Sequence, residues 1–439
     1  MPAAFLSLAL IACMAWIIYS GSYLKWHPFF SLLTAAVGFG LATGLTVEKL
    51  LEVITHGFGS LVGTIGLIVI FGCILGVVLE DSGSVQALGN WLARRSKRPS
   101  LSIALLGMLL GIPVFCDSGF IILFSLTRSM AQASQTPLPA MSLSLAGGLY
   151  SSHTLVPPTP GPVAAAGTIG ASIGLVMIWG IIIAIPVTIV SHLFSLYIGK
   201  KLTTLDTTQP IRSEGAGSTS ADRALILILF PVALIALGSL AELLSWQGYA
   251  GRSLTLLGKP VVALFLGTGL ALLLSRKTAN LTGMIDKALR QAGPIILLTA
   301  CGGALGAVLR ASSLTEVMNS VLGKQLSFGA GFLVAAFLIG AIFKTAQGST
   351  TSAMILTSAF FAPLMPTVGL ASPLDLALLV LAIGGGAMTV SHANDSYFWV
   401  VTQFTGFTLR DGFRGMTVMT LLQGLTALLT VLLIFMVSR

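Results

Sequence analysis

Charge is scarce in this sequence: only 8% of its 439 residues are Asp, Glu, Lys or Arg, whereas 55% are hydrophobic. A soluble globular domain carries about 25% charged residues, so the composition excludes that class. Apolar runs of about 20 residues, the length that crosses a bilayer, recur from end to end. The sequence therefore predicts an all-α polytopic membrane protein with no separate soluble domain.

Several chemical signatures are also missing. The four cysteines lie in apolar segments without metal-ligand spacing, so we expect neither a disulfide nor a metal site at Cys13, Cys73, Cys116 and Cys301. No G-x-x-x-x-G-K-[ST] motif occurs, which argues against ATP-driven transport, and we expect no cofactor. No H-E-x-x-H motif and no serine nucleophile paired with a base is found, so an intramembrane enzyme is the weaker alternative.

The net charge of +9 does not indicate a nucleic-acid partner, because Lys and Arg fall mainly in short loops rather than on one stripe. The densest basic cluster, Arg94–Arg98, is expected in the cytoplasm by the positive-inside rule. The polar linker 200–223 and the basic segment Arg276–Arg290 are expected on the same side. The linker separates two transmembrane halves, residues 1–199 and 224–439, and both termini are then expected on the external side.

Six uninterrupted apolar runs are expected to span the membrane: residues 3–20, 28–47, 61–79, 172–198, 224–244 and 260–274. The first run lacks the basic start and the cleavage site of a signal peptide, so we expect it to remain as a span. A short mixed segment with Glu48, Lys49, Glu52 and His56 is expected between the second and third spans.

Other apolar stretches are interrupted by polar residues, glycine or proline. The prolines between Pro157 and Pro162 cannot continue a helix, because each removes a backbone donor and clashes with the preceding turn. Non-helical backbone at membrane depth is tolerated only where protein or a watery cavity satisfies it. A proline-rich external loop is the alternative at that place. We expect four broken elements to converge, at Gly111–Gly119, Ser151–Gly161, Lys344–Thr351 and Ser391–Ser396.

The two halves of the chain share a pattern. Gly72–Ser82 (GCILGVVLEDS) and Gly302–Ser312 (GGALGAVLRAS) have Gly, Leu, Gly, Val, Leu and Ser at corresponding places. Further correspondences pair Gly111 with Gly340, Gly119 with Gly348, and Ser152–His153 with Ser391–His392. Corresponding loops differ in basic charge, so we expect two inverted repeats. Inverted repeats with broken helices place a substrate site at the midplane, where half-helix N-termini attract anions.

The polar residues of these breaks can bind a carboxylate and neighbouring hydroxyls or exchange protons. The candidate substrate-binding residues are Ser118, Gly119, His153, Thr154, Lys344, Thr345, Gln347, Gly348, Ser349, Thr350, His392 and Asn394. The candidate proton-coupling residues are Asp117 and Asp395. Each has a structural alternative: an Asp can cap a half-helix, a His can donate to a carbonyl, and Lys344 can pair with an acidic side chain.

The same breaks resemble a known family. GIPVFCDSGFIIL, SSHTLVPPTPGPVAAA, AQGSTTSAM and SHANDSYFWVVTQF are similar to signature stretches of the gluconate permease (GntP) family of proton symporters, and the similarity covers nearly the whole chain. The resemblance implies an inverted-repeat transporter of the ion-transporter superfamily type, which imports gluconate or a related hydroxy acid with protons, commonly as a homo-oligomer. Members of the family also carry other aldonates, D-serine or 3-hydroxybutyrate.

The sequence thus predicts a carrier in the bacterial inner membrane that couples a small hydroxylated organic anion to protons by alternating access. A sodium-coupled acid carrier is the main alternative, because unwound carbonyls near Gly119 and Gly348 could hold sodium. A permease for D-serine or 3-hydroxybutyrate, and a channel, are further alternatives.

Overall fold

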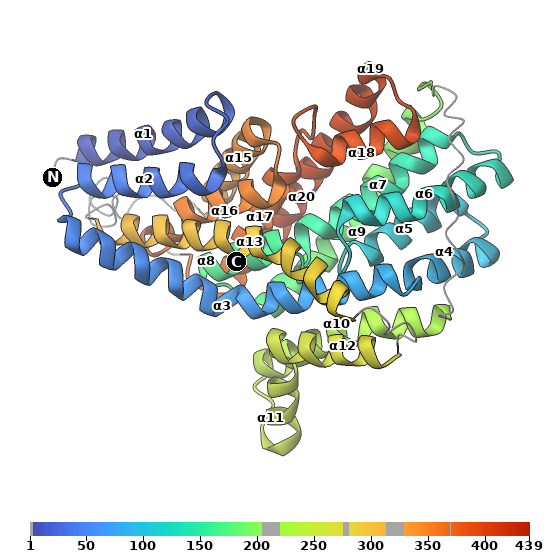
Figure 1. Ribbon diagram of the computed structural model, residues 1–439, viewed down its shortest axis with the longest axis horizontal. Coiled ribbons are helices and arrows are strands. Elements are labelled where there is room, and N and C mark those ends of the chain that lie inside the picture. Colours follow the sequence, from blue (N-terminus) through green and yellow to red (C-terminus); the bar gives the residue numbers. More distant parts are fainter. Residues whose placement is uncertain (1–2, 204–219, 275–280, 313–328, 369) are drawn as a thin grey trace.

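A computed structural model describes residues 3–203, 220–274, 281–312, 329–368 and 370–439 (Figure 1). These residues are mostly helical and contain no β-strand. Six of their helices are long and apolar enough to cross a membrane. A seventh span results if α11 (Gly248–Leu257) and α12 (Pro260–Leu274), which are bent by 72°, are counted as one. The all-α, multi-pass membrane class predicted from composition is confirmed.

The first half of the chain forms α1 (Ala3–Ser22), α2 (Pro28–Ala42), α3 (Val47–Asp81), α4 (Ser84–Arg95), α5 (Pro99–Leu110), α6 (Cys116–Ala133), α7 (Leu138–Leu155), α8 (Pro160–Ile169) and α9 (Ile173–Ile198). The second half forms α10 (Ala221–Leu243), α11, α12, α13 (Leu281–Ala311), α15 (Gly329–Gln347), α16 (Thr350–Phe361), η2 (Ala362–Val368), α17 (Pro373–Met388), α18 (Ser396–Thr405), α19 (Leu409–Gly412), η3 (Phe413–Thr417) and α20 (Val418–Val437).

Short polar residues and glycine set many of the helix ends. Thr46 caps α3 by accepting a hydrogen bond from the backbone N–H of Lys49. Ser372 and Asp375 form a capping box at the start of α17, in which each side chain accepts from the other's backbone N–H. Gly170 and Gly406 end α8 and α18 with φ of +80° and +75°, a conformation that glycine adopts without a steric penalty.

The helices form a wall and an inner bundle. The wall is a row of neighbours in the order α1, α2, α13, α3, α12, α10, and α11 projects from it (Figure 1). The bundle contains α5 to α9 and α15 to α20, and it includes the four breaks expected from the sequence. In the bundle, α5 and α6 both pack on α7, and α15 and α16 both pack on α17, so each pair forms a helical hairpin. The wall therefore supports one side of the broken elements.

The wall is centred on α3 and α13, which pack against each other in opposite directions. In the first half of α3, Gly57 lies against the last third of α13. A Cβ on Gly57 would collide with Gly303 and Ala307. At the other end, Lys287 near the start of α13 pairs with Glu80 and Asp81 at the end of α3, at 3.3 and 3.0 Å. This antiparallel contact joins the two helices that carry the similar stretches, and it places those stretches at opposite ends of the pair.

Several expected boundaries differ from the structure. The mixed segment Glu48–His56 is not a loop but the first turns of α3, which has 35 residues and is about 50 Å long. Its amphipathic start is a good helix former, and the N-cap at Thr46 places the helix start before it. Arg94 and Arg95 likewise end α4 rather than lie in a loop. Arg276, Lys277 and linker residues 204–219 lie outside the described residues.

The register expected between the halves also shifts. A Cβ on Gly107 of α5 would lie 2.8 Å from the oxygen of Leu145 and 3.0 Å from the nitrogen of Leu149. A Cβ on Gly340 of α15 would meet the corresponding atoms of Ile383 and Ala387 at 3.1 and 3.4 Å. Gly340 therefore has its packing equivalent at Gly107, four residues before Gly111, because Gly111 lies at the break where α5 ends.

We predict that Gly57→Ala lowers the melting temperature of the purified protein. The new methyl group would lie 2.6 Å from Cβ of Ala307, and overpacking of this kind costs about 1–3 kcal/mol. The matched control is Gly59→Ala on the same helix, where no atom lies within 4 Å and the higher helix propensity of alanine acts alone. Equal melting temperatures for the two variants would contradict the close α3–α13 contact.

Candidate functional site

Three of the four interruptions of the bundle are shorter than the sequence suggested, and the last one begins two residues earlier than expected. The breaks are Gly111–Phe115, Val156–Thr159, Gly348–Ser349 and Thr389–Asp395. Pro160 and Pro162 lie in the first turn of α8, where a missing N–H removes no helical hydrogen bond. Asp117, Ser118 and Gly119 likewise belong to the first turns of α6, and Lys344 to the last turn of α15. The alternative of a proline-rich external loop is therefore wrong, since its residues are buried in the bundle.

The N-termini of four half-helices meet in two pairs. Ser396 at the start of α18 donates to Oδ2 of Asp117 in the first turn of α6, at 3.3 Å. Gly161 at the start of α8 faces Thr351 and Met354 of α16. Because the N-terminus of a helix carries a partial positive charge, the centre of the bundle favours anions.

Lys344 forms the most buried ion pair of the described residues. Its ammonium group lies 2.6 Å from Oδ2 of Asp395, and the two side chains are only 1% and 7% exposed. It also donates to the carbonyl oxygen of Gly348 at 2.7 Å and to the hydroxyl of Thr350 at 3.1 Å. Lys344 thus pairs with an acidic side chain, as in its structural alternative, and joins the α15/α16 hairpin to the α17/α18 break.

Asp395 is held from several sides. It caps α18 by accepting from the backbone N–H of Tyr397 at 3.1 Å, so the capping alternative applies to this aspartate. The hydroxyl of Ser391 donates to the same oxygen that faces Lys344. With a cation and two further donors, the charge of Asp395 is compensated within the bundle.

Two stacked tyrosines link α7 to this cluster. The rings of Tyr150 and Tyr397 stack at 5.3 Å, and the Tyr150 hydroxyl shares a 2.8 Å hydrogen bond with Thr350. Tyr397 donates to the carbonyl of Ala146 at 3.0 Å. Both rings are fully buried. We did not expect these tyrosines from the sequence, although a hydroxylated ring beside each of two breaks was a usable signal.

The α15/α16 tip and the α17/α18 break are also joined through their backbones. Asn394 and His392 both lie against the carbonyl oxygen of Thr345, at 2.8 and 3.1 Å. Gly348 has φ of +77°, and a Cβ there would collide with the backbone of Asn394. His392 therefore faces a carbonyl, as in its structural alternative.

Asp117 differs from Asp395 in its surroundings. Its Oδ1 atom is buried without a hydrogen-bond partner, and Oδ2 has only the hydroxyl of Ser396. The N-cap of α6 is Phe115, so Asp117 does not cap this helix. The neighbouring Ser118 faces Glu80 of α3, and Gly119 packs on Leu149 of α7.

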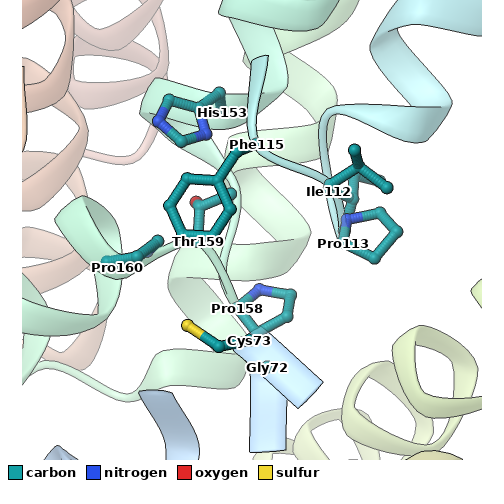
Figure 2. A pocket seen from close by; sticks show the side chains of 10 residues that line it. Gly72, Cys73, Ile112, Pro113, Phe115, His153, Pro158, Thr159 and Pro160 are labelled. Atoms are coloured by element: carbon teal, nitrogen blue, oxygen red, sulfur yellow. The ribbon is translucent and has the colours of Figure 1, made fainter. Parts of the chain in front are cut away.

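His153 lines a small cavity between the first two breaks. The cavity has a volume of about 10 Å³, roughly the space of one water molecule. Figure 2 shows His153 beside Phe115, with Thr159 and Pro158 below them. Nδ1 of His153 is buried without a partner. Thr154, by contrast, donates to the carbonyl of Tyr150 in its own helix at 2.9 Å.

The candidate residues thus differ in exposure, and Asp117, Ser118, Gln347, Thr350 and His392 are half-buried. Thr345, Ser349, Asn394 and the unforeseen Ser396 are exposed, whereas Lys344, Gly348 and Asp395 lie beneath them. The amide of Gln347 is buried without a partner and faces Gly21 of α1, away from this cluster. Within the described part of the chain, no three His, Cys, Asp or Glu side chains gather as a metal site would require.

Comparisons with known proteins agree on one family. Residues 4–437 match the family model described as GntP family permease. The chain is 34% identical to the inner membrane permease YgbN of Escherichia coli (strain K12), over 92% of this chain and 93% of that protein. It is 30% identical to a gluconate permease of Pseudomonas aeruginosa, with 94% of each chain covered.

A solved structure has a similar fold. The YdaH transporter of Alcanivorax borkumensis, whose crystal structure is described as revealing an unusual topology, superposes with a TM-score of 0.66. The sequences are 15% identical, and the alignment covers 92% of this chain and 96% of that one. This likeness concerns the fold alone.

We predict that Lys344→Met and Asp395→Asn each lower the melting temperature strongly, while the double variant loses less than the sum. Removing one partner leaves a buried charge uncompensated, which costs about 3–5 kcal/mol. The matched control is the exposed pair Lys49–Glu52, whose removal should change stability by about 1 kcal/mol or less. Additive losses in the double variant would show that Lys344 and Asp395 do not stabilise each other.

Proposed function

The chain belongs to the GntP permease family, and from this membership we propose that it imports a small hydroxylated organic acid together with protons by alternating access. As a permease with at least six apolar helices, it is a multi-pass inner-membrane transporter rather than an enzyme. The proposal covers the chemical class of the substrate, the coupling ion and the residues that bind them. We further expect a homo-oligomer with both termini outside.

The observation that carries the proposal is the difference between two aspartates at half-helix N-termini. Asp395 is neutralised by Lys344 at 2.6 Å. Asp117 forms no ion pair within the described residues, and its Oδ1 has no partner. A proton on Asp117 would neutralise a charge that the bundle leaves uncompensated. We therefore assign proton coupling to Asp117 and the role of a fixed counter-ion to Asp395.

The exposed polar groups near Asp117 suit a hydroxylated carboxylate. Ser349, Asn394 and Ser396 offer hydroxyl and amide groups that both donate and accept hydrogen bonds. The N-termini of α6, α16 and α18 lie beside these groups and would attract the carboxylate. The relative from Pseudomonas aeruginosa is named a gluconate permease. Gluconate is a polyhydroxy acid of this class.

Alternating access is supported by the packing. The cavity beside His153 is far smaller than the roughly 300 Å³ of typical ligand pockets. A substrate that enters there needs the tip of the α5/α6 hairpin and the α7/α8 break to separate. Two inverted repeats are supported by the antiparallel α3 and α13 and by the packing of α6 with α18 and of α8 with α16. In such carriers one part rocks against the other around a fixed site.

We predict that Asp117→Asn abolishes pH-driven accumulation of substrate in proteoliposomes but spares exchange of labelled for unlabelled substrate. Asparagine keeps the shape of aspartate and loses only its ability to take up a proton. A monovalent anion moving with one proton is electroneutral, so wild-type uptake should follow the pH gradient, and a second proton would add about 2.3 kcal/mol per 100 mV. The control is Glu52→Gln at the exposed start of α3. Normal accumulation by Asp117→Asn would show that this carboxylate has only a structural role.

We predict that hydroxylated monocarboxylates raise the melting temperature of the purified protein. The panel compares gluconate, 3-hydroxybutyrate and D-serine with glucose, which keeps the hydroxyls of gluconate but lacks the charge. Stabilisation should require the carboxylate, because the helix N-termini attract negative charge. A response to glucose as large as that to gluconate would contradict an anion site.

A further inference from the structure

The ammonium group of Lys344 is surrounded like a small bound cation. Its three oxygen partners are the carbonyl of Gly348, the hydroxyl of Thr350 and a carboxylate oxygen of Asp395, at 2.7, 3.1 and 2.6 Å. The face of the Tyr150 ring lies 5.8 Å away, which is within the range of a cation–π contact. The Lys344 side chain is only 1% exposed, so these protein groups replace its hydration shell.

Lys344 lies at a place in the fold where carriers with broken helices bind cations. Carriers with broken helices hold coupling cations at unwound carbonyls and at the C-terminal ends of half-helices. Gly348 is the unwound residue that follows α15, and Lys344 lies in the last turn of that helix. The carboxylate of Asp395 adds the negative charge that a bound cation requires. These oxygens are thus typical of a monovalent cation site. The cation that occupies it is the ammonium group of Lys344, which is part of the α15/α16 hairpin.

We propose that Lys344 is a built-in occupant of a monovalent cation site formed by Gly348, Thr350 and Asp395, and that removing its side chain opens this site to a free cation. The consequence for transport rests on the proposed function: a permanent cation at the tip of the α15/α16 hairpin makes transport independent of sodium. The binding itself does not rest on that function. The α15/α16 tip stays attached to the α17/α18 break without any ion from solution.

The test uses purified full-length protein without substrate, heated at constant ionic strength in choline, sodium, potassium or ammonium chloride. Wild type should melt at one temperature in all four salts. Lys344→Ala should melt several degrees lower in choline and recover with increasing concentration of at least one small cation. Ammonium is the strongest candidate, because the present distances already suit an ammonium group.

Two controls separate a site from a general salt effect. Lys344→Met is uncharged but fills the space of the lysine chain, so small cations should not restore it. Lys344→Ala with Asp395→Asn lacks the carboxylate and should also give no response. If Lys344→Ala melts equally in all four salts, or if either control recovers as well, the proposed cation site is wrong.

A second measurement decides the matter even if Lys344→Ala does not fold. Wild-type protein in proteoliposomes should take up labelled substrate at the same rate when sodium is replaced by choline at a fixed pH gradient. Uptake that needs sodium would overturn the inference. Failure of the proposed function gives a different result, namely no pH-driven uptake in either salt, while the melting experiment reports on the cation site without any transport.

Discussion

Unpaired backbone at membrane depth is the constraint on which this structure depends. In hydrocarbon, each N–H or C=O that a helix break releases costs several kcal/mol unless the protein pairs it. Lys344 pairs the carbonyl of Gly348, and Asn394 pairs that of Thr345. In the Thr389–Asp395 break, Thr420 accepts from the N–H of Ser391 and Thr417 donates to its carbonyl. Tyr397 and Gln423 add hydrogen bonds to the carbonyls of Ala146 and Gly147 inside α7. The Thr389–Asp395 break is therefore held by residues of η3 and α20.

The two long wall helices complete this support through glycine. On α3, a Cβ at Gly76 would lie 2.5 Å from the carbonyl oxygen of Pro113, and one at Gly72 would lie 3.4 Å from that of Pro158. On α13, a Cβ at Gly302 would lie 2.6 Å from the side chain of Ile355 of α16. Only residues without a side chain allow this close approach. The glycines shared by the two halves thus mark where the wall meets the bundle.

The bundle is similar in its packing but unequal in its chemistry. The first two breaks carry an unpaired carboxylate at Asp117 and an unpaired imidazole nitrogen at His153. The last two carry a carboxylate whose charge Lys344 compensates. A similar arrangement of half-helices therefore holds a carboxylate without an ion pair on one side and a buried ion pair on the other. Under the proposed function, the first of these groups takes up the coupled proton.

The sequence by itself determined the membrane class, the four interruptions and the polar residues that gather at them, because scarce charge, apolar runs and breaks by glycine or proline act locally. It could not determine the length of α3, the four-residue shift between Gly107 and Gly111, or the stacking of Tyr150 on Tyr397, since these depend on packing between distant helices. From the sequence, Asp117 and Asp395 were both candidates for proton coupling. Only the tertiary structure distinguished them, because Lys344 lies 51 positions before Asp395 and reaches it through the fold.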